Sequence, residues 1–120
     1  MQKLIPALAV IGATVIAAQA RAGGVSIPSN GSYASLHATD YTGSYFRFNF
    51  SSNGTISVYA WEEVYDRTFS CVKSPSDPDY EDFKQKALAF VNSESRRFMP
   101  AMTVYRNSSL CTTAVYQHYR

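Results

Sequence analysis

The chain has 120 residues, of which 46% are hydrophobic and 17% are charged, and its formal net charge is +2. This length fits one domain. The basic residues are scattered, with Arg96 and Arg97 as their one adjacent pair. A nucleic-acid-binding domain normally carries clustered Lys and Arg, so we expect no nucleic-acid partner.

The first 22 residues have the three-part layout of a secretory signal peptide. Lys3 gives a positive start, residues 4–18 form an uncharged apolar run, and small residues recur at two cleavage positions, after Ala20 and after Ala22. The apolar run is shorter than the roughly 20 residues that a helix needs to span a bilayer. We therefore expect residues 1–22 to be removed as a signal peptide, leaving a secreted or periplasmic protein without a membrane anchor.

Removal of this signal peptide leaves nine basic and nine acidic residues, and the net charge is then near zero. Residues 23–31 are rich in Gly, Ser, Pro and Asn, which predicts a flexible leader. Residues 32–120 are then one small domain. A short strand near 33–38 is its first expected element, and the Tyr-, Phe- and Val-rich segments that follow favour further strands.

Residues 45–61 predict a β-hairpin, because apolar and polar residues alternate on both sides of Asn53-Gly54. A two-residue Asn-Gly loop would place Asn49 opposite Val58 and mix polar with apolar residues on one face. A three-residue loop over 52–54, with Gly54 in the left-handed conformation, instead pairs Phe50 with Ile56 and Phe48 with Val58. Since the buried face determines register, we prefer the three-residue loop.

The second half of the chain predicts a third strand over 64–72, one helix and two closing strands. Asp77 suits the N-cap of the helix and Pro78 its first position. The helix carries an apolar stripe at helical spacing, made of Tyr80, Phe83, Ala87, Phe90 and Val91. Closing strands are expected over 102–106 and 110–116. The fold class is α+β: an antiparallel sheet of about five strands with one α-helix packed on a face.

The two cysteines, Cys71 and Cys111, both lie after the predicted signal peptide. They allow one intramolecular pairing, and export leads to an oxidising compartment, so we expect a single disulfide between them.

Catalytic and metal-binding patterns are weak in this sequence. His37 and His118 are the candidates for a base near neutral pH. Together with Glu62 or Glu63 and Arg67, they would supply the residue types of a small exported nuclease. No metal-ligand spacing occurs, and we expect neither a metal nor a cofactor.

The polar side of the predicted hairpin is the most informative feature for function. The residues expected on this face are Tyr45, Arg47, Asn49, Tyr59 and Trp61. Tyr, Trp and Arg are typical of binding hot spots, so the face could bind a protein or a glycan. The alternative is that the helix covers these rings and they belong to the core. An exported binding module is our leading hypothesis; the others are an exported hydrolase such as a nuclease, and a secreted host-directed factor.

Four Asn residues lie in Asn-x-Ser/Thr sequences: Asn30, Asn49, Asn53 and Asn107. They would be glycosylation sites in a eukaryotic secretory route. In a bacterium the same pattern reflects polar residues that favour turns.

Overall fold

The computed structural model describes residues 16–20, 24–37, 43–93 and 99–119. They form one sheet of eight strands and one helix. The strands are β2 (Ile16–Ala20), β3 (Gly24–Ser26), β4 (Tyr33–His37), β5 (Tyr45–Phe50), β6 (Ile56–Glu62), β7 (Arg67–Lys73), β8 (Met99–Asn107) and β9 (Leu110–Tyr119), and the helix is α1 (Tyr80–Ser93).

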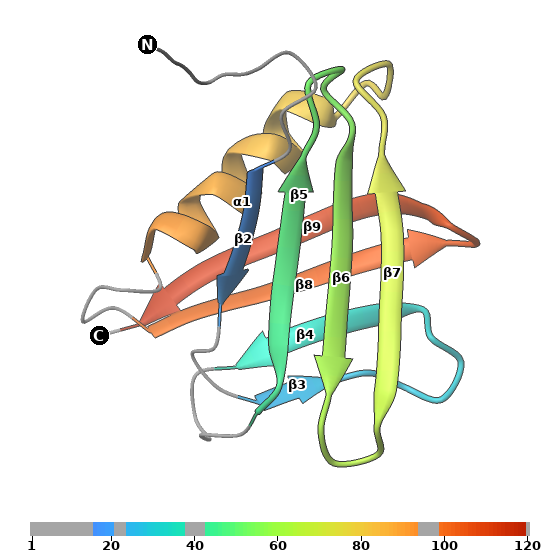
Figure 1. Cartoon of the computed structure of the whole chain (residues 1–120), viewed down its shortest axis with the longest axis vertical. Helices are drawn as coiled ribbons and strands as arrows, with labels where there is room; N and C mark the ends of the chain where they lie inside the picture. Colours follow the sequence, from blue (N-terminus) through green and yellow to red (C-terminus); the bar gives the residue numbers. More distant parts are fainter. Residues whose placement is uncertain (1–15, 21–23, 38–42, 94–98, 120) are drawn as a thin grey trace, which may run out of the picture.

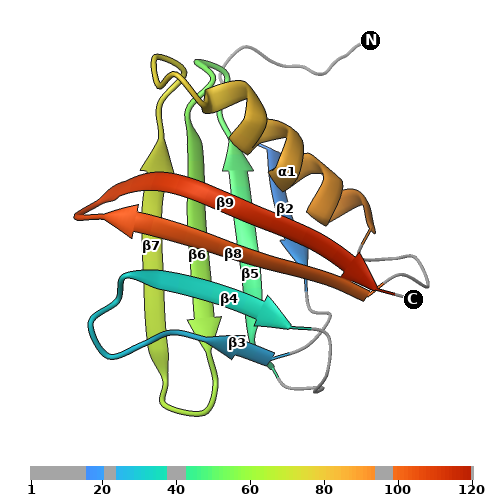
Figure 2. The ribbon, with the colours of Figure 1, turned by 180° about the vertical axis from the view of Figure 1, so that it is seen from behind.

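The sheet folds back on itself to make two layers. Its strand order is β2-β5-β6-β7-β9-β8-β4-β3. In Figure 1, strands β2, β5, β6 and β7 stand side by side in front, and the other four cross behind them. Figure 2 shows that α1 lies beside β9 in the second layer, on the inner side of β2 and β5. The core fills the space between the layers.

The expected α+β class is confirmed, and the described residues contain the one expected helix, but two details of the predicted sheet are wrong. The described sheet has eight strands rather than about five, and it is mixed rather than antiparallel. The parallel contact joins β7 to β9, with Val72 opposite Leu110. The chain reaches β9 by way of α1 and β8, and such a return can lay two strands parallel. Alternation of apolar and polar residues predicts strands, but it carries no information about which strands pair, such as β7 with β9.

The hairpin of β5 and β6 has the predicted register. Phe50 pairs with Ile56, Phe48 with Val58, and Phe46 with Ala60. Gly54 has a φ of 93°, and a Cβ at this position would lie 2.8 Å from Cγ of Pro75. The loop therefore needs glycine for its backbone conformation and for its packing.

Strand β7 begins three residues later than predicted. Residues 63–66 form a turn instead, in which the amide of Asp66 donates to the carbonyl of Glu63 and Asp66 has a φ of 51°. Val64 and Tyr65 are exposed in this turn. Their side chains favour a strand by propensity, but the left-handed Asp66, a residue type that tolerates this conformation, completes the turn that reverses the chain between β6 and β7. Phe69 and Cys71 are buried on one side of β7.

The helix begins at Tyr80, two residues after the predicted start. The first helical bond runs from the amide of Phe83 to the carbonyl of Asp79. The carboxylate of Asp77 accepts a bond from the amide of Ser74 and so closes the preceding turn. The predicted apolar stripe faces the core: Tyr80, Phe83, Ala87 and Phe90 are buried, and Val91 is half-buried.

The first described strands contain residues that we expected to lie outside the domain. Residues 23–31 were expected to be a flexible leader, yet β3 pairs with β4, and Val25 and Ile27 are buried. Alternating apolar residues favour a strand, and here Gly, Ser and Pro of the same stretch obscured that pattern. Strand β2 lies within the predicted signal peptide and pairs with β5.

The disulfide between Cys71 and Cys111 is confirmed, and it joins β7 to β9 where the two layers meet. The Cα atoms of the two residues lie 5.1 Å apart. Beside it, the amide of Val72 donates to the carbonyl of Ser109 at 3.0 Å. The two layers therefore share one covalent link and a single described ladder position at this joint.

Replacing both cysteines by alanine tests how much the joint depends on the disulfide. The two residues are 40 positions apart, and closing a loop of that length stabilises a fold by about 4 kcal/mol in the chain-entropy account. We expect urea unfolding of the double variant to show a loss of this size, or a chain that no longer folds. A loss below about 1 kcal/mol would contradict this account of the joint.

Candidate functional site

The outer face of β5 and β6 gathers the predicted binding residues. Tyr45 pairs with Trp61, Arg47 with Tyr59, and Asn49 with Ser57. Since directly paired residues share a face, these side chains lie on one surface. All six are half-buried, whereas the alternate residues of both strands, from Phe46 to Glu62, are mostly buried. We name this surface the aromatic face: Tyr45, Arg47, Asn49, Ser57, Tyr59 and Trp61.

The aromatic face points away from the helix. Phe46 and Phe48, on the other side of β5, have ring centroids 5.9 and 6.1 Å from that of Phe90 in α1. In Figure 1 the strands β5 and β6 stand in front of α1 and of the second layer. The alternative interpretation, in which the helix covers the aromatic face, therefore does not describe this structure.

Contacts between neighbouring side chains hold the aromatic face together. The ring centroid of Tyr45 lies 6.0 Å from that of Tyr59 and 6.2 Å from that of Trp61, with interplanar angles of 40° and 41°. The guanidinium of Arg47 lies 5.0 Å from the centroid of Tyr59, a cation–π distance. Trp61 donates its indole Nε1–H to Oδ1 of Asp66 at 2.8 Å. Contacts of this kind restrict the rotamers of these side chains, so the aromatic face is ordered within the chain itself.

Two residues that the sequence analysis did not single out extend this surface onto β7. Thr68 lies opposite Trp61, and Ser70 opposite Tyr59. Both are exposed. The late start of β7 obscured them, although alternation with the buried Phe69 and Cys71 would have placed them on this side.

The residues proposed for a hydrolase lie on strands β4, β6, β7 and β9, and Glu63 lies in the turn after β6. His37 ends β4 and His118 lies near the end of β9, and β8 runs between these two strands. Glu62 is buried, and its Oε2 accepts the amide of Ile27 at 2.8 Å. Arg67 donates through Nη1 to the carbonyl of Ile27 at 2.8 Å. Glu62 and Arg67 thus both hold the chain that follows β3.

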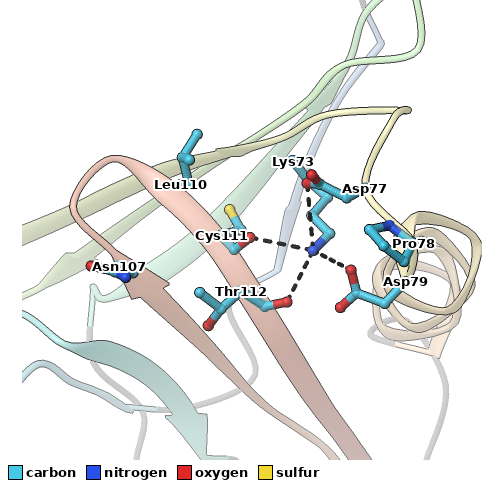
Figure 3. Close-up of a pocket in the computed structure, with 8 residues that line it drawn as sticks. All are labelled: Lys73, Asp77, Pro78, Asp79, Asn107, Leu110, Cys111 and Thr112. Atoms are coloured by element: carbon cyan, nitrogen blue, oxygen red, sulfur yellow. Dashed lines mark hydrogen bonds and ion pairs between the residues drawn. The ribbon is translucent and has the colours of Figure 1, made fainter.

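A hollow beside the disulfide contains a buried lysine, shown in Figure 3. Lys73 ends β7, and its ammonium donates to the carbonyls of Cys111 and Thr112 at 3.3 and 2.9 Å. It also lies 2.5 Å from Oδ1 of Asp79 and 3.6 Å from Oδ2 of Asp77. Each N–H of the ammonium therefore has an acceptor within reach. These contacts favour a structural role for Lys73, which links β7 to β9 and to the start of α1, over a role as a nucleophile.

The same ammonium changes the acidity of Asp79. The hydrogen bond from Lys73 holds the pKa of this carboxyl below its ordinary value of 3.8, against a smaller opposing effect of burial. The alternation of Phe69, Cys71 and Lys73 along β7 would have placed Lys73 on the inner side, so the sequence did carry a signal for this contact.

Within the described ranges, no group of three or more His, Cys, Asp or Glu side chains is placed to hold a metal ion. No helix among the same residues is long and apolar enough to cross a membrane. None of the protein-family models, curated proteins or solved structures compared with this chain matches it. Function is therefore inferred from the chain's own residues.

Replacing Lys73 by methionine tests how much the Lys73 contacts stabilise the fold, because methionine keeps most of the side chain and removes the charge. The variant leaves two carbonyls of β9 without their donor, and we expect a loss of about 2 kcal/mol in urea unfolding. Lys86→Met is the matched control: Lys86 also donates to a β9 carbonyl and pairs with Asp82, but it is more exposed. Its loss should stay below about 1 kcal/mol.

The pH dependence gives a second measure of the same contact. Because folding lowers the pKa of Asp79, the stabilisation from this pair is present above pH 3.8 and is lost as the pH falls below that value. The acid-side decline in stability should be shallower in Lys73→Met than in the parent chain. Equal slopes in both proteins would show that Lys73 does not control this titration.

Proposed function

We propose that this chain is an exported, disulfide-stabilised domain that binds a partner protein through its aromatic face. One observation carries this proposal. Tyr45, Tyr59 and Trp61 are half-buried, on the side of β5 and β6 that faces away from α1 and from the second layer. Rings in that position do not contribute to the core between the layers. Tyr, Trp and Arg placed together at a surface are typical of the residues that dominate binding energy in protein interfaces.

The geometry of the rings favours a protein over a glycan. A stacked sugar needs an open, flat aromatic surface. Here the rings of Tyr45 and Tyr59 are tilted by 40° and pack against each other, and the Arg47 guanidinium lies over the ring of Tyr59. A protein partner can instead fill the uneven surface between them and accept hydrogen bonds from Arg47. The exposed hydroxyls of Thr68 and Ser70 provide a polar margin on the β7 side.

Two observations support the proposed export. The first 22 residues have the layout of a signal peptide. The disulfide between Cys71 and Cys111 is a bond that persists in oxidising compartments and is rare in the cytosol.

Alanine variants of Tyr59 and Trp61 test the aromatic face. The parent protein is first screened against a displayed library of protein domains and against a glycan array. Truncating a central ring should weaken the selected complex by about 30-fold or more, the size of a hot-spot effect. Thr68→Ala, at the margin of the same surface, should change the affinity by less than about threefold.

Circular dichroism and urea unfolding of each variant separate binding from folding. Loss of binding with the fold retained supports the aromatic face. Unchanged binding in both ring variants would contradict it, and unfolding of both would place the rings in the core. A ligand found on the glycan array alone would replace the protein partner by a glycan.

A further inference from the structure

Strand β2 forms one edge of the sheet and lies within the segment that the proposed export would remove. It pairs with β5 over five residues, from Ile16 opposite Phe50 to Ala20 opposite Phe46. It also contacts α1. In Figures 1 and 2 it occupies a single-strand position beside β5 and beneath the helix. Hydrolysis of the peptide bond after Ala20 or Ala22 by the exporting cell's leader peptidase would take β2 away.

Loss of β2 would leave β5 as an edge strand. The backbone N–H and C=O groups that β2 engages on that edge would then lose their protein partners, and such an edge is a template for another strand. The edge is not peripheral to the core, because Phe46 and Phe48 of β5 are fully buried. A second strand at this position would therefore both complete the backbone hydrogen bonds and cover the margin of the core.

We propose that removal of the signal peptide, residues 1–22, turns the outer edge of β5 into a slot that receives one extended peptide strand from a partner protein. This inference rests on the export that forms part of the proposed function. Recognition would follow the strand-addition mode, in which backbone hydrogen bonds give affinity and alternate side chains give specificity.

The register of β2 defines the chemistry of the peptide. Its residues opposite the inward positions Phe50, Phe48 and Phe46 are Ile16, Ala18 and Ala20. The intervening positions are Ala17 and Gln19, so the strand carries no charge. The slot therefore fits an antiparallel, uncharged segment of about five residues, with an aliphatic or small side chain at every second position.

A second copy of this chain fits the slot less well. Pairing β5 with itself would bring Phe rings to the inward positions that are Ile and Ala in β2, and larger side chains at buried positions cost strain. The ends of β8 and β9 also extend past β2 in Figure 1, so a whole second domain has less room at this edge than a single strand. A single strand avoids both conflicts.

The experiment uses the full chain, expressed in a host that exports it, and the exported form is purified oxidised. Intact mass first establishes whether the signal peptide has been removed. A fluorescein-labelled peptide with the sequence of residues 14–22 is then titrated against this form, and binding is followed by anisotropy. We expect saturable binding, together with increased hydrogen-exchange protection of the β5 amides.

Two peptide variants make a matched pair. Ala18→Glu places a charge opposite the buried Phe48 and should weaken binding at least about tenfold. Ala17→Glu places the same charge opposite Asn49 on the aromatic face and should change it by less than about threefold.

Each outcome decides the proposal. Absent binding, or equal effects of the two variants, overturns the slot while leaving export and the aromatic face intact. A dimeric exported form that excludes the peptide, seen by sedimentation, assigns the edge to a second copy and also overturns the slot. A protein recovered with residues 1–22 still attached overturns export together with the open edge.

Discussion

The joint between β7 and β9 is the constraint on which the rest of this fold depends. An eight-stranded sheet closes over its own core here because its two halves meet at this position, where Val72 and Leu110 form the one described ladder pair. Backbone pairing alone would be weak over so short a length. The disulfide supplies a covalent link, and the Lys73 ammonium donates to the two carbonyls at Cys111 and Thr112. Because Lys73 also pairs with Asp79, the start of α1 is attached to the same point.

This joint determines which side of the first layer meets solvent. Folding the second layer and α1 onto one side of β5 and β6 buries Phe46, Phe48 and Val58. The other side then carries the aromatic face. Its residues are held by their contacts with one another and by the bond from Trp61 to Asp66. Asp66 thus has two roles, since its left-handed conformation ends the turn before β7 and its carboxylate fixes the indole.

Local patterns were sufficient for the elements that are built from neighbouring residues. The hairpin register followed from the requirement that Phe46, Phe48 and Phe50 share one face, and the helix followed from its apolar stripe. The cysteine pairing was predictable because Cys71 and Cys111 allow one intramolecular bond. The members of the aromatic face were likewise predictable, because alternation about a known loop places them together. Their exposure was not, since it depends on which side the helix packs.

Long-range pairings were beyond these patterns. The alternation of Val25 and Ile27 is too short to predict their burial, because that burial depends on β4 and on the distant Glu62, which accepts the amide of Ile27. The parallel contact of β7 with β9 arises from the path of the chain through α1 and β8. Val64 and Tyr65 have strand propensity, and it is the backbone of Asp66 that places them in a turn. In the first two cases a contact between remote segments outweighs a local preference, and in the third the backbone conformation of a neighbouring residue does so.

The accessibility of Trp61 tests the central claim most directly, namely that the aromatic face lies outside the core. Trp61 is the one tryptophan of the chain, so acrylamide quenching of the folded, oxidised protein reports on this position alone. The account predicts red-shifted emission and ready quenching, as for an indole at a surface. Blue-shifted emission that acrylamide leaves almost unquenched would contradict it, because Trp61 would then belong to the core and the aromatic face would not be a binding surface.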